Sequence, residues 1–293
     1  MTTLISKAQY KRSEKGEFHE IAARNVDDTI ALLLNFPWDT ERHLTSVELT
    51  CPSISVEQLT GACLKIGPYF SGKFALYYLD TSNNVSFKIV NTLADAAIWI
   101  NTFFEQEGLL QDWEKYTFTW KSATFFHTNP FEYVVNAKAI RSFLGIIIRS
   151  VLIIFLLCLM LFMTRPDSSI ISLFFSLIVI LLMLTSPLYI VFFNYLLADK
   201  GSYLQISQGE DEFVYGKAGN NKIYNKQNIA EVIIYGVWQS RPGFWNDCRV
   251  YKITFNDGEQ LKFSSLLIEE SALLRKFSYD RLKFVSRFLP GFV

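Results

Sequence analysis

The side chains best suited to acid–base or metal chemistry in this sequence are three histidines, His19, His43 and His127. They are far apart, and none has a second histidine four positions away, the spacing at which one helix face can hold a metal ion. The sequence also contains no P-loop, HExxH, GxSxG or GxGxxG motif. We therefore expect a protein that is not an enzyme and that has no metal or other cofactor.

Four cysteines, Cys51, Cys63, Cys158 and Cys248, are the other candidates for chemistry. No two of them form a CxxC pair, and Cys158 lies within a long apolar run. This spacing indicates neither a zinc site nor a disulfide framework. It is typical of a protein in a reducing compartment.

Charge is balanced overall but uneven along the chain. The 28 basic residues cancel the 28 acidic ones, which argues against a nucleic-acid-binding protein. Residues 1–137 hold 11 Lys and Arg against 16 Asp and Glu, a net charge of −5, whereas residues 138–293 hold 17 against 12, a net charge of +5. The acidic part of the chain is therefore its N-terminal part.

Two long apolar runs lie in the middle of the chain, at residues 142–163 and 170–197, with the short segment TRPDSS between them. At a rise of about 1.5 Å per residue, even the shorter run would reach about 33 Å as a helix, enough to cross a bilayer. The one charge within the runs, Arg149, can reach toward the headgroups. The pattern predicts a transmembrane helical hairpin over residues 137–198. The alternative, a buried helical pair in a soluble protein, requires a larger domain than this chain offers.

The charges that flank these runs predict their orientation. Lys138, Arg141, Arg149 and Lys200 lie toward one side, and Arg165 alone lies toward the other. By the positive-inside rule, both ends of the hairpin then face the cytoplasm. The first residues of the chain hold no apolar stretch typical of a signal peptide. We expect an inner (plasma) membrane protein with both soluble domains cytoplasmic.

An α+β domain is expected at residues 17–136, after a flexible N-terminus of residues 1–16. Asn25 is a suitable N-cap for a helix at 26–34, and Thr92 with Asp95 forms a capping box for a helix at 93–106. The segments between these helices favour strands. The predicted strands are 46–50, 62–66, 73–80 and 86–90.

This order of elements resembles the small α+β immunity proteins that bacteria make against contact-delivered polymorphic toxins. The resemblance covers residues 19–107, through the segments NVDDTIALLL, ACLKIGPYFSGKFALYYLD and NTLADAAIWINTFF. It implies a protein partner and no catalytic residues, with acidic charge directed at a basic toxin. Tyrosine-rich surfaces suit binding hot spots, although the same aromatic side chains could instead form core and cross-strand pairs. The candidate partner-binding residues are Tyr69, Phe70, Lys73, Tyr77 and Tyr78.

The C-terminal part, residues 199–293, is rich in short strand-like segments. Asn256-Asp257-Gly258 between the last two of them predicts a β-hairpin. Residues 269–289 are expected to form one closing helix. The sequence predicts a pleckstrin-homology-like (PH-like) β-barrel capped by that helix. The predicted strands are 203–207, 212–216, 221–225, 231–236, 249–255 and 259–265.

The chain also resembles bacterial membrane proteins that carry such a domain directly after a transmembrane hairpin. This resemblance covers residues 140–290, through the hairpin and the segments YLQIS, NKQNIAEVIIY and RVYKITFNDGEQLKF. Lys217, Lys222 and Lys226 form no dense cluster between the first strands. The phosphoinositide binding of eukaryotic relatives is therefore not expected here.

Two sets of residues are candidates for contact with a membrane surface. The loop at 236–248 holds aromatic side chains that could enter the headgroup layer or pack over the barrel. The basic side of the closing helix could lie on anionic lipid or be an ordinary solvated face. The loop residues are Trp238, Arg241, Phe244 and Trp245, and the helix residues are Arg275, Lys276, Arg281, Lys283 and Arg287.

These expectations favour a membrane-anchored protein-binding protein, most concretely an immunity protein that neutralises a contact-delivered bacterial toxin. The alternative is a membrane-bound regulator or assembly factor that acts through the PH-like domain. The expected partners are a protein and the lipid bilayer, with no nucleic acid and no small-molecule substrate. A transporter is not expected, because Arg149 alone supplies no path of ionisable groups across a membrane.

Overall fold

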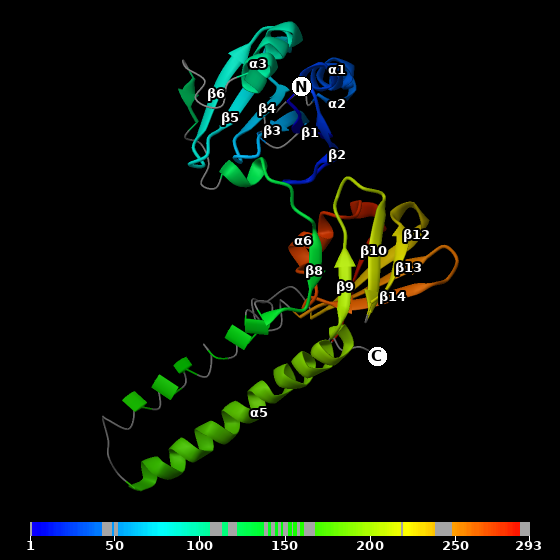
Figure 1. Cartoon of the computed structure of the whole chain (residues 1–293). Coiled ribbons are helices and arrows are strands. Elements are labelled where there is room, and N and C mark those ends of the chain that lie inside the picture. Colours follow the sequence, from blue (N-terminus) through cyan, green and yellow to red (C-terminus); the bar gives the residue numbers. More distant parts are fainter. Residues whose placement is uncertain are drawn as a thin grey trace. The chain divides into compact units, whose positions relative to one another are not determined.

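The chain forms two compact units in a computed structural model (Figure 1). The first is Met1–Pro130 with Ser207–Glu210, and the second is Phe131–Ile206 with Asp211–Val293. We expected three parts, 17–136, 137–198 and 199–293, but the middle segment belongs to the second unit. The structure describes residues 2–42, 49, 52–105, 113–116, 122–137, single positions between 140 and 160, and residues 168–217, 219–237 and 248–287, with only some side chains described in the helix at 168–199.

The first unit is built on one antiparallel sheet with the strand order β2-β1-β3-β4-β5-β6-β7. Consecutive strands from β3 to β7 are neighbours, so most of the sheet is a simple meander. The predicted strands at 62–66, 73–80 and 86–90 are confirmed as β4, β5 and β6. The strands are β1 Leu4–Gln9, β2 His19–Arg24, β3 Ser53–Glu57, β4 Cys63–Pro68, β5 Phe74–Leu79, β6 Val85–Val90 and β7 Glu114–Lys115.

Both predicted helix caps of the first unit are present. The Asn25 side chain accepts a hydrogen bond from the backbone N–H of Asp28 at the start of α1 (Val26–Asn35). At the start of α3 (Leu93–Glu105), the Thr92 hydroxyl accepts the backbone N–H of Asp95 at 3.1 Å, and the Asp95 carboxylate accepts the backbone N–H of Thr92 at 3.0 Å. These helices, with α2 (Trp38–Glu41), pack on one face of the sheet. A second apolar cluster with η2 (Ser122–Phe125) lies on the other face.

Strand β1 occupies residues that we expected to be a flexible N-terminus. Its sequence, LISKAQ, has polar residues where a strand core would be apolar, and this hid the strand from pattern analysis. The structure buries them: Lys7 is 1% exposed, and its ammonium group donates to Glu57 at 2.6 Å and to the Phe126 carbonyl at 2.8 Å. The predicted strand at 46–50 lies outside the described residues apart from Leu49.

The second unit contains two four-stranded sheets, with orders β11-β10-β9-β8 and β14-β13-β12-β15. Apolar side chains from both sheets form one core, with Phe213 and Tyr251 among its buried members. The predicted hairpin at Asn256-Asp257-Gly258 is confirmed, with Gly258 at φ +87°. The strands are β8 Glu132–Val134, β9 Ser202–Gln205, β10 Glu212–Lys217, β11 Asn220–Asn225, β12 Ile229–Gly236, β13 Val250–Phe255, β14 Gln260–Ser264 and β15 Leu282–Ser286.

The predicted transmembrane hairpin is corrected by the structure. Among the residues described, no helix is both long enough and apolar enough to span a membrane. Part of the apolar sequence of helix α5 (Ser168–Asp199) packs within the second unit. There Val191, Phe192 and Tyr195 are buried in one cluster with Val250 of β13. The predictions of membrane anchoring and of an inner-membrane location depended on the hairpin and are wrong with it. Arg149 lies outside the described residues.

The predicted closing helix at 269–289 is also wrong. The segment forms a short helix α6 (Glu270–Leu274), a turn η4 (Tyr279–Arg281) and strand β15. After the turn the backbone is extended, and β15 pairs in parallel with β12. Its residues, LKFVS, include aromatic and β-branched side chains that favour a strand.

Candidate binding site

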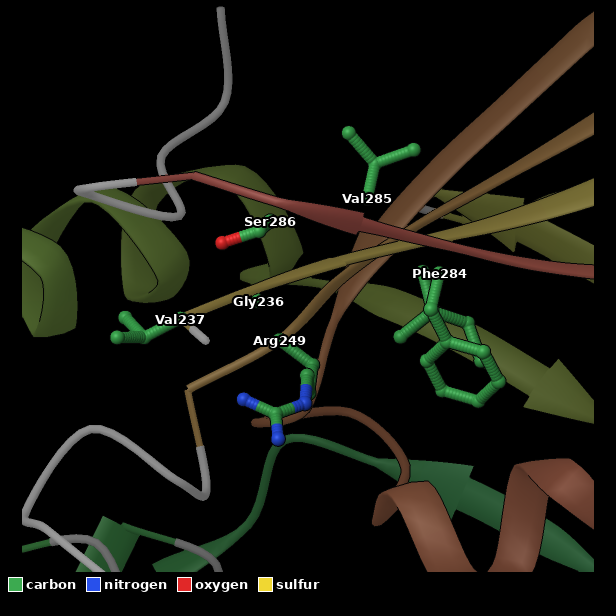
Figure 2. A pocket seen from close by; sticks show the side chains of 7 residues that line it. Gly236, Val237, Arg249, Phe284, Val285 and Ser286 are labelled. Atoms are coloured by element: carbon green, nitrogen blue, oxygen red, sulfur yellow. The ribbon is translucent and has the colours of Figure 1, made fainter. Parts of the chain in front are cut away.

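A pocket of about 220 Å³ lies at the end of β12 in the second unit (Figure 2). Strand β12 and the residue after it form one wall, β15 forms another, and Arg249, just before β13, closes a third side. None of the lining residues is a histidine, cysteine, lysine or carboxylate. They are Ile234, Gly236, Val237, Arg249, Phe284, Val285 and Ser286.

Arg249 is fixed in place beside the backbone of Gly236. Its side chain is 5% exposed, and its Nε donates to the Glu270 carboxylate at 2.8 Å. A Cβ atom on Gly236 would lie 2.7 Å from Nη1 of Arg249, so a larger residue would push the guanidinium away. The pocket wall therefore carries a positive charge that is already paired and held rigidly.

Strand β15 forms the exposed rim of this pocket. It is the last strand of its sheet, and its pairing places Phe284 beside Ile234 and Ser286 beside Gly236. Phe284 and Val285 point to opposite sides of the strand (Figure 2) and are 46% and 39% exposed. Within the described part of the chain, no strand pairs with the outer edge of β15. Its backbone on that side can accept another strand.

The basic residues predicted to share one helix face do not belong to one helix in the structure, because their segment forms α6, η4 and β15. Lys276 is buried at 3% exposure, with its ammonium group 4.7 Å from the centre of the Phe131 ring. The other four make separate contacts: Arg275 donates to Ser271 O, Arg281 donates to Lys226 O, Lys283 pairs with Glu231, and Arg287 lies over Tyr235. The loop candidates Trp238, Arg241, Phe244 and Trp245 lie outside the described residues.

The predicted partner-binding residues of the first unit separate into buried and exposed members. Tyr77 and Tyr78 are 5% and 6% exposed and belong to the clusters on opposite faces of the sheet, so they occupy the core. Burial raises the pKa of Tyr77 well above its usual value. Phe70 is 55% exposed, Lys73 is exposed, and Tyr69 is half-buried with its ring 5.2 Å from that of Phe70.

The three lysines near the first strands of the second unit are each engaged. Lys217 donates to the Ala198 carbonyl at 2.8 Å, Lys222 pairs with Glu259, and Lys226 is 7% exposed. Their charges are therefore not gathered into a basic pocket of the kind that binds inositol phosphates.

The two described cysteines, Cys63 and Cys248, are both buried. Burial raises the pKa of Cys63 to about 12, so its thiol remains protonated and unreactive near neutral pH. Among the described residues, no cluster of three histidine, cysteine or carboxylate side chains is placed to hold a metal ion.

A PH domain family model matches residues 132–276 of the chain. The chain carries a PH-like domain. The match begins at β8 and includes the strands of both sheets of the second unit except β15, and the segment between the paired strands β8 and β9 lies within it. PH domains are typically non-catalytic binding modules for proteins or lipids. Comparison with curated proteins and with solved structures gives no significant match.

This pocket is only partly predictable from the sequence. The predicted strands at 231–236 and 249–255 are confirmed as β12 and β13, but the sequence analysis predicts a helix where β15 forms a wall. The alternation in LKFVS, with Leu282 and Phe284 two residues apart, was the available signal for a strand.

Proposed function

We propose that this chain is a non-catalytic protein-binding protein, and that the PH-like domain binds its partner at the edge formed by β12 and β15. The observation that carries the proposal is an exposed edge strand with two exposed apolar residues, Phe284 and Val285, beside a preformed pocket. Edge strands of this kind bind extended segments of other proteins through main-chain hydrogen bonds and side-chain pockets.

A protein partner is favoured over a lipid headgroup by the chemistry of this edge. Backbone N–H and C=O groups along a strand match another strand, whereas a headgroup phosphate requires clustered, unpaired cations. The guanidinium in the pocket is paired with Glu270, and Lys217 and Lys222 are engaged elsewhere. A PH-like domain is consistent with either ligand, so lipid binding is the competing outcome of the test.

Site-specific photo-crosslinking tests the proposal. A photoreactive amino acid replaces half-buried Val237, which lines the pocket. The matched control carries it at Ile223, which is 65% exposed on β11 of the same unit. Irradiation of cells that produce the full-length chain is expected to give discrete protein adducts at position 237 and not at 223. Equal adducts at both positions, or adducts with lipid alone at 237, would contradict the proposal.

The identity of the partner stays a prediction. An immunity protein would bind a toxin, and a regulator or assembly factor would bind a component of another complex. The resemblance to immunity proteins concerned the first unit, where Phe70 and Lys73 are the exposed members of the predicted surface. Mass spectrometry of the adducts at position 237 would identify the protein and separate these two possibilities.

A further inference from the structure

We infer that β15 is a displaceable strap on the edge of β12, and that an extended segment of the partner protein binds by taking its place. The inference rests on the proposed function and deepens it, because it names the surface that is uncovered and the mode of binding. The segment that fits carries an apolar, a basic and an apolar residue in succession.

The first support is that β15 lies outside the matched domain. The family match ends at Lys276, whereas β15 begins at Leu282. Strand β12 lies inside the match and has β13 on one side and β15 on the other. Without β15, β12 would therefore be the open edge of its sheet, with fully buried Val232 and nearly fully buried Ile234 along it.

The second support is that β15 differs from the other strands in direction and burial. It pairs in parallel, whereas every other strand pair in the described part of the chain is antiparallel. Four of its five residues are exposed, and only Leu282 is half-buried against the core. A strand that buries so little apolar surface is held weakly, because burial is the main source of its stability.

The side chains of Lys283 and Arg287 add little to the attachment of β15, and the bond from Arg281 to the Lys226 carbonyl at 2.6 Å lies in the turn before the strand begins. Lys283 pairs with Glu231 at 2.7 Å, but its side chain is 65% exposed, and exposed ion pairs contribute little to stability. The Arg287 guanidinium lies 3.9 Å from the centre of the Tyr235 ring at the far end of the strand. Both contacts can form again with another strand that carries basic residues at the positions of Lys283 and Arg287.

The register between β12 and β15 defines the chemistry of the replacing segment. Leu282 and Phe284 lie beside Val232 and Ile234, so a new strand needs apolar side chains two residues apart. The residue between them lies near Glu231, as Lys283 does, so a basic side chain is favoured there. Because Phe284, Val285 and Ser286 line the pocket, their removal leaves it open for the incoming side chains.

A reversible disulfide tests whether β15 must leave the edge of β12 before an extended segment can bind there. Ile233→Cys and Lys283→Cys place two thiols at directly paired positions of β12 and β15 in the full-length chain. The probe is a fluorescent peptide with the sequence of residues 280–287, DRLKFVSR, and its binding is measured by fluorescence anisotropy. The reduced protein is expected to bind it at least about tenfold more tightly than the oxidised protein. Equal affinity in the two states would overturn the inference.

A charge change that loosens the strap gives a second, independent test. Lys283→Glu places a carboxylate against Glu231 and is expected to raise the affinity for the same peptide about threefold to tenfold. The matched control is Lys262→Glu, the same change at an exposed site on β14, the opposite edge of the sheet. A peptide with glutamate in place of its lysine should bind more weakly than DRLKFVSR. Unchanged affinity in Lys283→Glu, or an equal rise in Lys262→Glu, would contradict the strap.

The disulfide also separates failure of the strap from failure of the proposed function. The crosslinker at Val237 is combined with the cysteine pair, and partner adducts are compared in the reduced and oxidised proteins. Adducts that disappear on oxidation support both proposals. Adducts that persist on oxidation overturn the strap and leave the proposed function standing, whereas absence of protein adducts in both states overturns the proposed function. Dimers that require the reduced state would show that the replacing strand comes from a second copy, which contradicts a different protein as occupant.

Discussion

Strands β2 and β15 each form the edge of a sheet and expose most of their side chains, but the chain attaches them in different ways. Strand β2 follows β1 after a short loop and runs antiparallel to it. Strand β15 follows β14 through α6 and η4, and it runs parallel to β12, which is distant in sequence. Closing a short loop costs less conformational entropy than joining distant segments.

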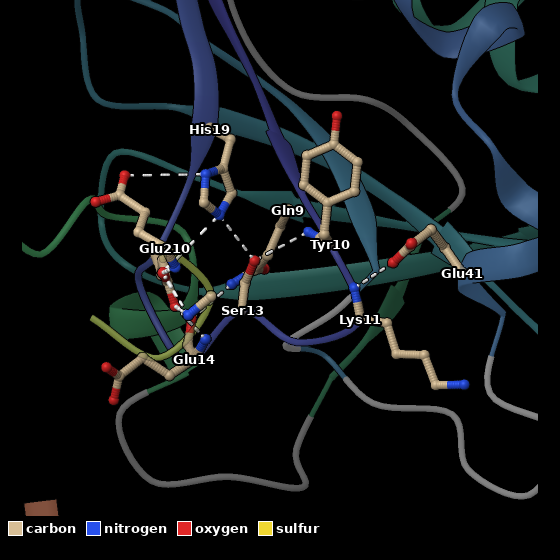
Figure 3. Close-up of polar contacts among 10 residues, drawn as sticks. Gln9, Tyr10, Lys11, Ser13, Glu14, His19, Glu41 and Glu210 are labelled. Atoms are coloured by element: carbon tan, nitrogen blue, oxygen red, sulfur yellow. Dashed lines mark hydrogen bonds and ion pairs between the residues drawn. The ribbon is translucent and has the colours of Figure 1, made fainter. Parts of the chain in front are cut away.

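The loop between β1 and β2 is also fastened by polar contacts (Figure 3). The hydroxyl of Ser13 lies 3.1 Å from the His19 ring and from the N–H of Tyr10. The carboxylate of Glu17, buried at 3% exposure, accepts the N–H groups of Glu14 at 2.8 Å and Gly209 at 2.8 Å. It also accepts the N–H of Glu210 at 3.1 Å.

Strand β15 has no buried carboxylate of this kind among its described contacts, and its nearest polar anchor is Arg281 in the preceding turn, which donates to the Lys226 carbonyl at 2.6 Å. Its ion pair lies at the surface, and its cation–π contact joins two half-buried side chains. Exposure alone therefore does not decide whether an edge strand is permanent. What decides it is how the strand is connected and whether buried groups hold its ends. On this basis β2 is a fixed edge and β15 is an exchangeable one.

The largest expected loss of stability is at Ile234 of β12, and it is compared with the loss at Phe284, which lies beside it on β15. Ile234→Ala should lower the free energy of unfolding by about 3 kcal/mol, because removing a nearly fully buried side chain leaves a cavity. Phe284→Ala should lower it by less than about 1 kcal/mol, because the side chain is already 46% exposed. Urea denaturation of the two full-length variants measures both values. A loss at Phe284 as large as that at Ile234 would mean that β15 is part of the core.

A somewhat smaller effect is expected at the anchor of the β1–β2 loop. Glu17→Ala removes a buried carboxylate that accepts three backbone N–H groups, and we expect a loss of about 2–3 kcal/mol in the free energy of unfolding. The control is Glu210→Ala, whose side chain is 58% exposed and should cost less than about 0.5 kcal/mol. Equal stability of the Glu17→Ala and Glu210→Ala variants would show that the contacts of Glu17 do not hold β2 in place.

The smallest expected effect on stability is a pH dependence at β14, the other edge of the sheet that contains β15. Its Ser264 donates from its N–H, at 3.0 Å, and from its hydroxyl to fully buried Asp199 of α5. Burial raises the pKa of Asp199 to about 6, and the bonds from Ser264 oppose that rise. A raised acid pKa means that the folded state binds the proton more tightly than the unfolded chain does. The stability from this group is therefore greatest below about pH 4 and is lost as the pH rises through about 6.

Asp199→Asn should remove this pH dependence while keeping an acceptor for Ser264. Between pH 4 and pH 8 the natural protein should lose about 2 kcal/mol more than the variant in free energy of unfolding. Denaturation curves at several pH values give the difference. Parallel pH profiles for the two proteins would show that Asp199 does not titrate in this range.

Much of the fold follows from local sequence patterns. The caps at Asn25 and Thr92 and the turn at Asn256-Asp257-Gly258 are short-range signals, and the structure confirms all three. The strands of the second unit that alternate apolar and polar residues were found within a few positions of their observed ends. These elements are predictable because each is determined by side chains close to it in sequence.

The errors arose where tertiary contacts override local pattern. Strand β1 was missed because Lys7 and Gln9 are polar, and their burial depends on partners far along the chain, such as Glu57 and Phe126. Strand β15 was read as helix because basic residues recur near apolar ones at 275–287, yet the backbone there pairs with β12. The pocket could not be predicted from sequence for the same reason, since β15 forms one of its walls.

Hydrogen–deuterium exchange of the full-length chain compares the two edges most directly. If β15 is an exchangeable strap and β2 a fixed edge, the amides that bond β15 to β12 should exchange about 100-fold faster than those that bond β2 to β1, because a difference of about 3 kcal/mol in opening free energy has that effect. Amides shared by β12 and β13 provide an internal reference for the stable part of the same sheet. Protection of β15 equal to that of β2 would contradict the account.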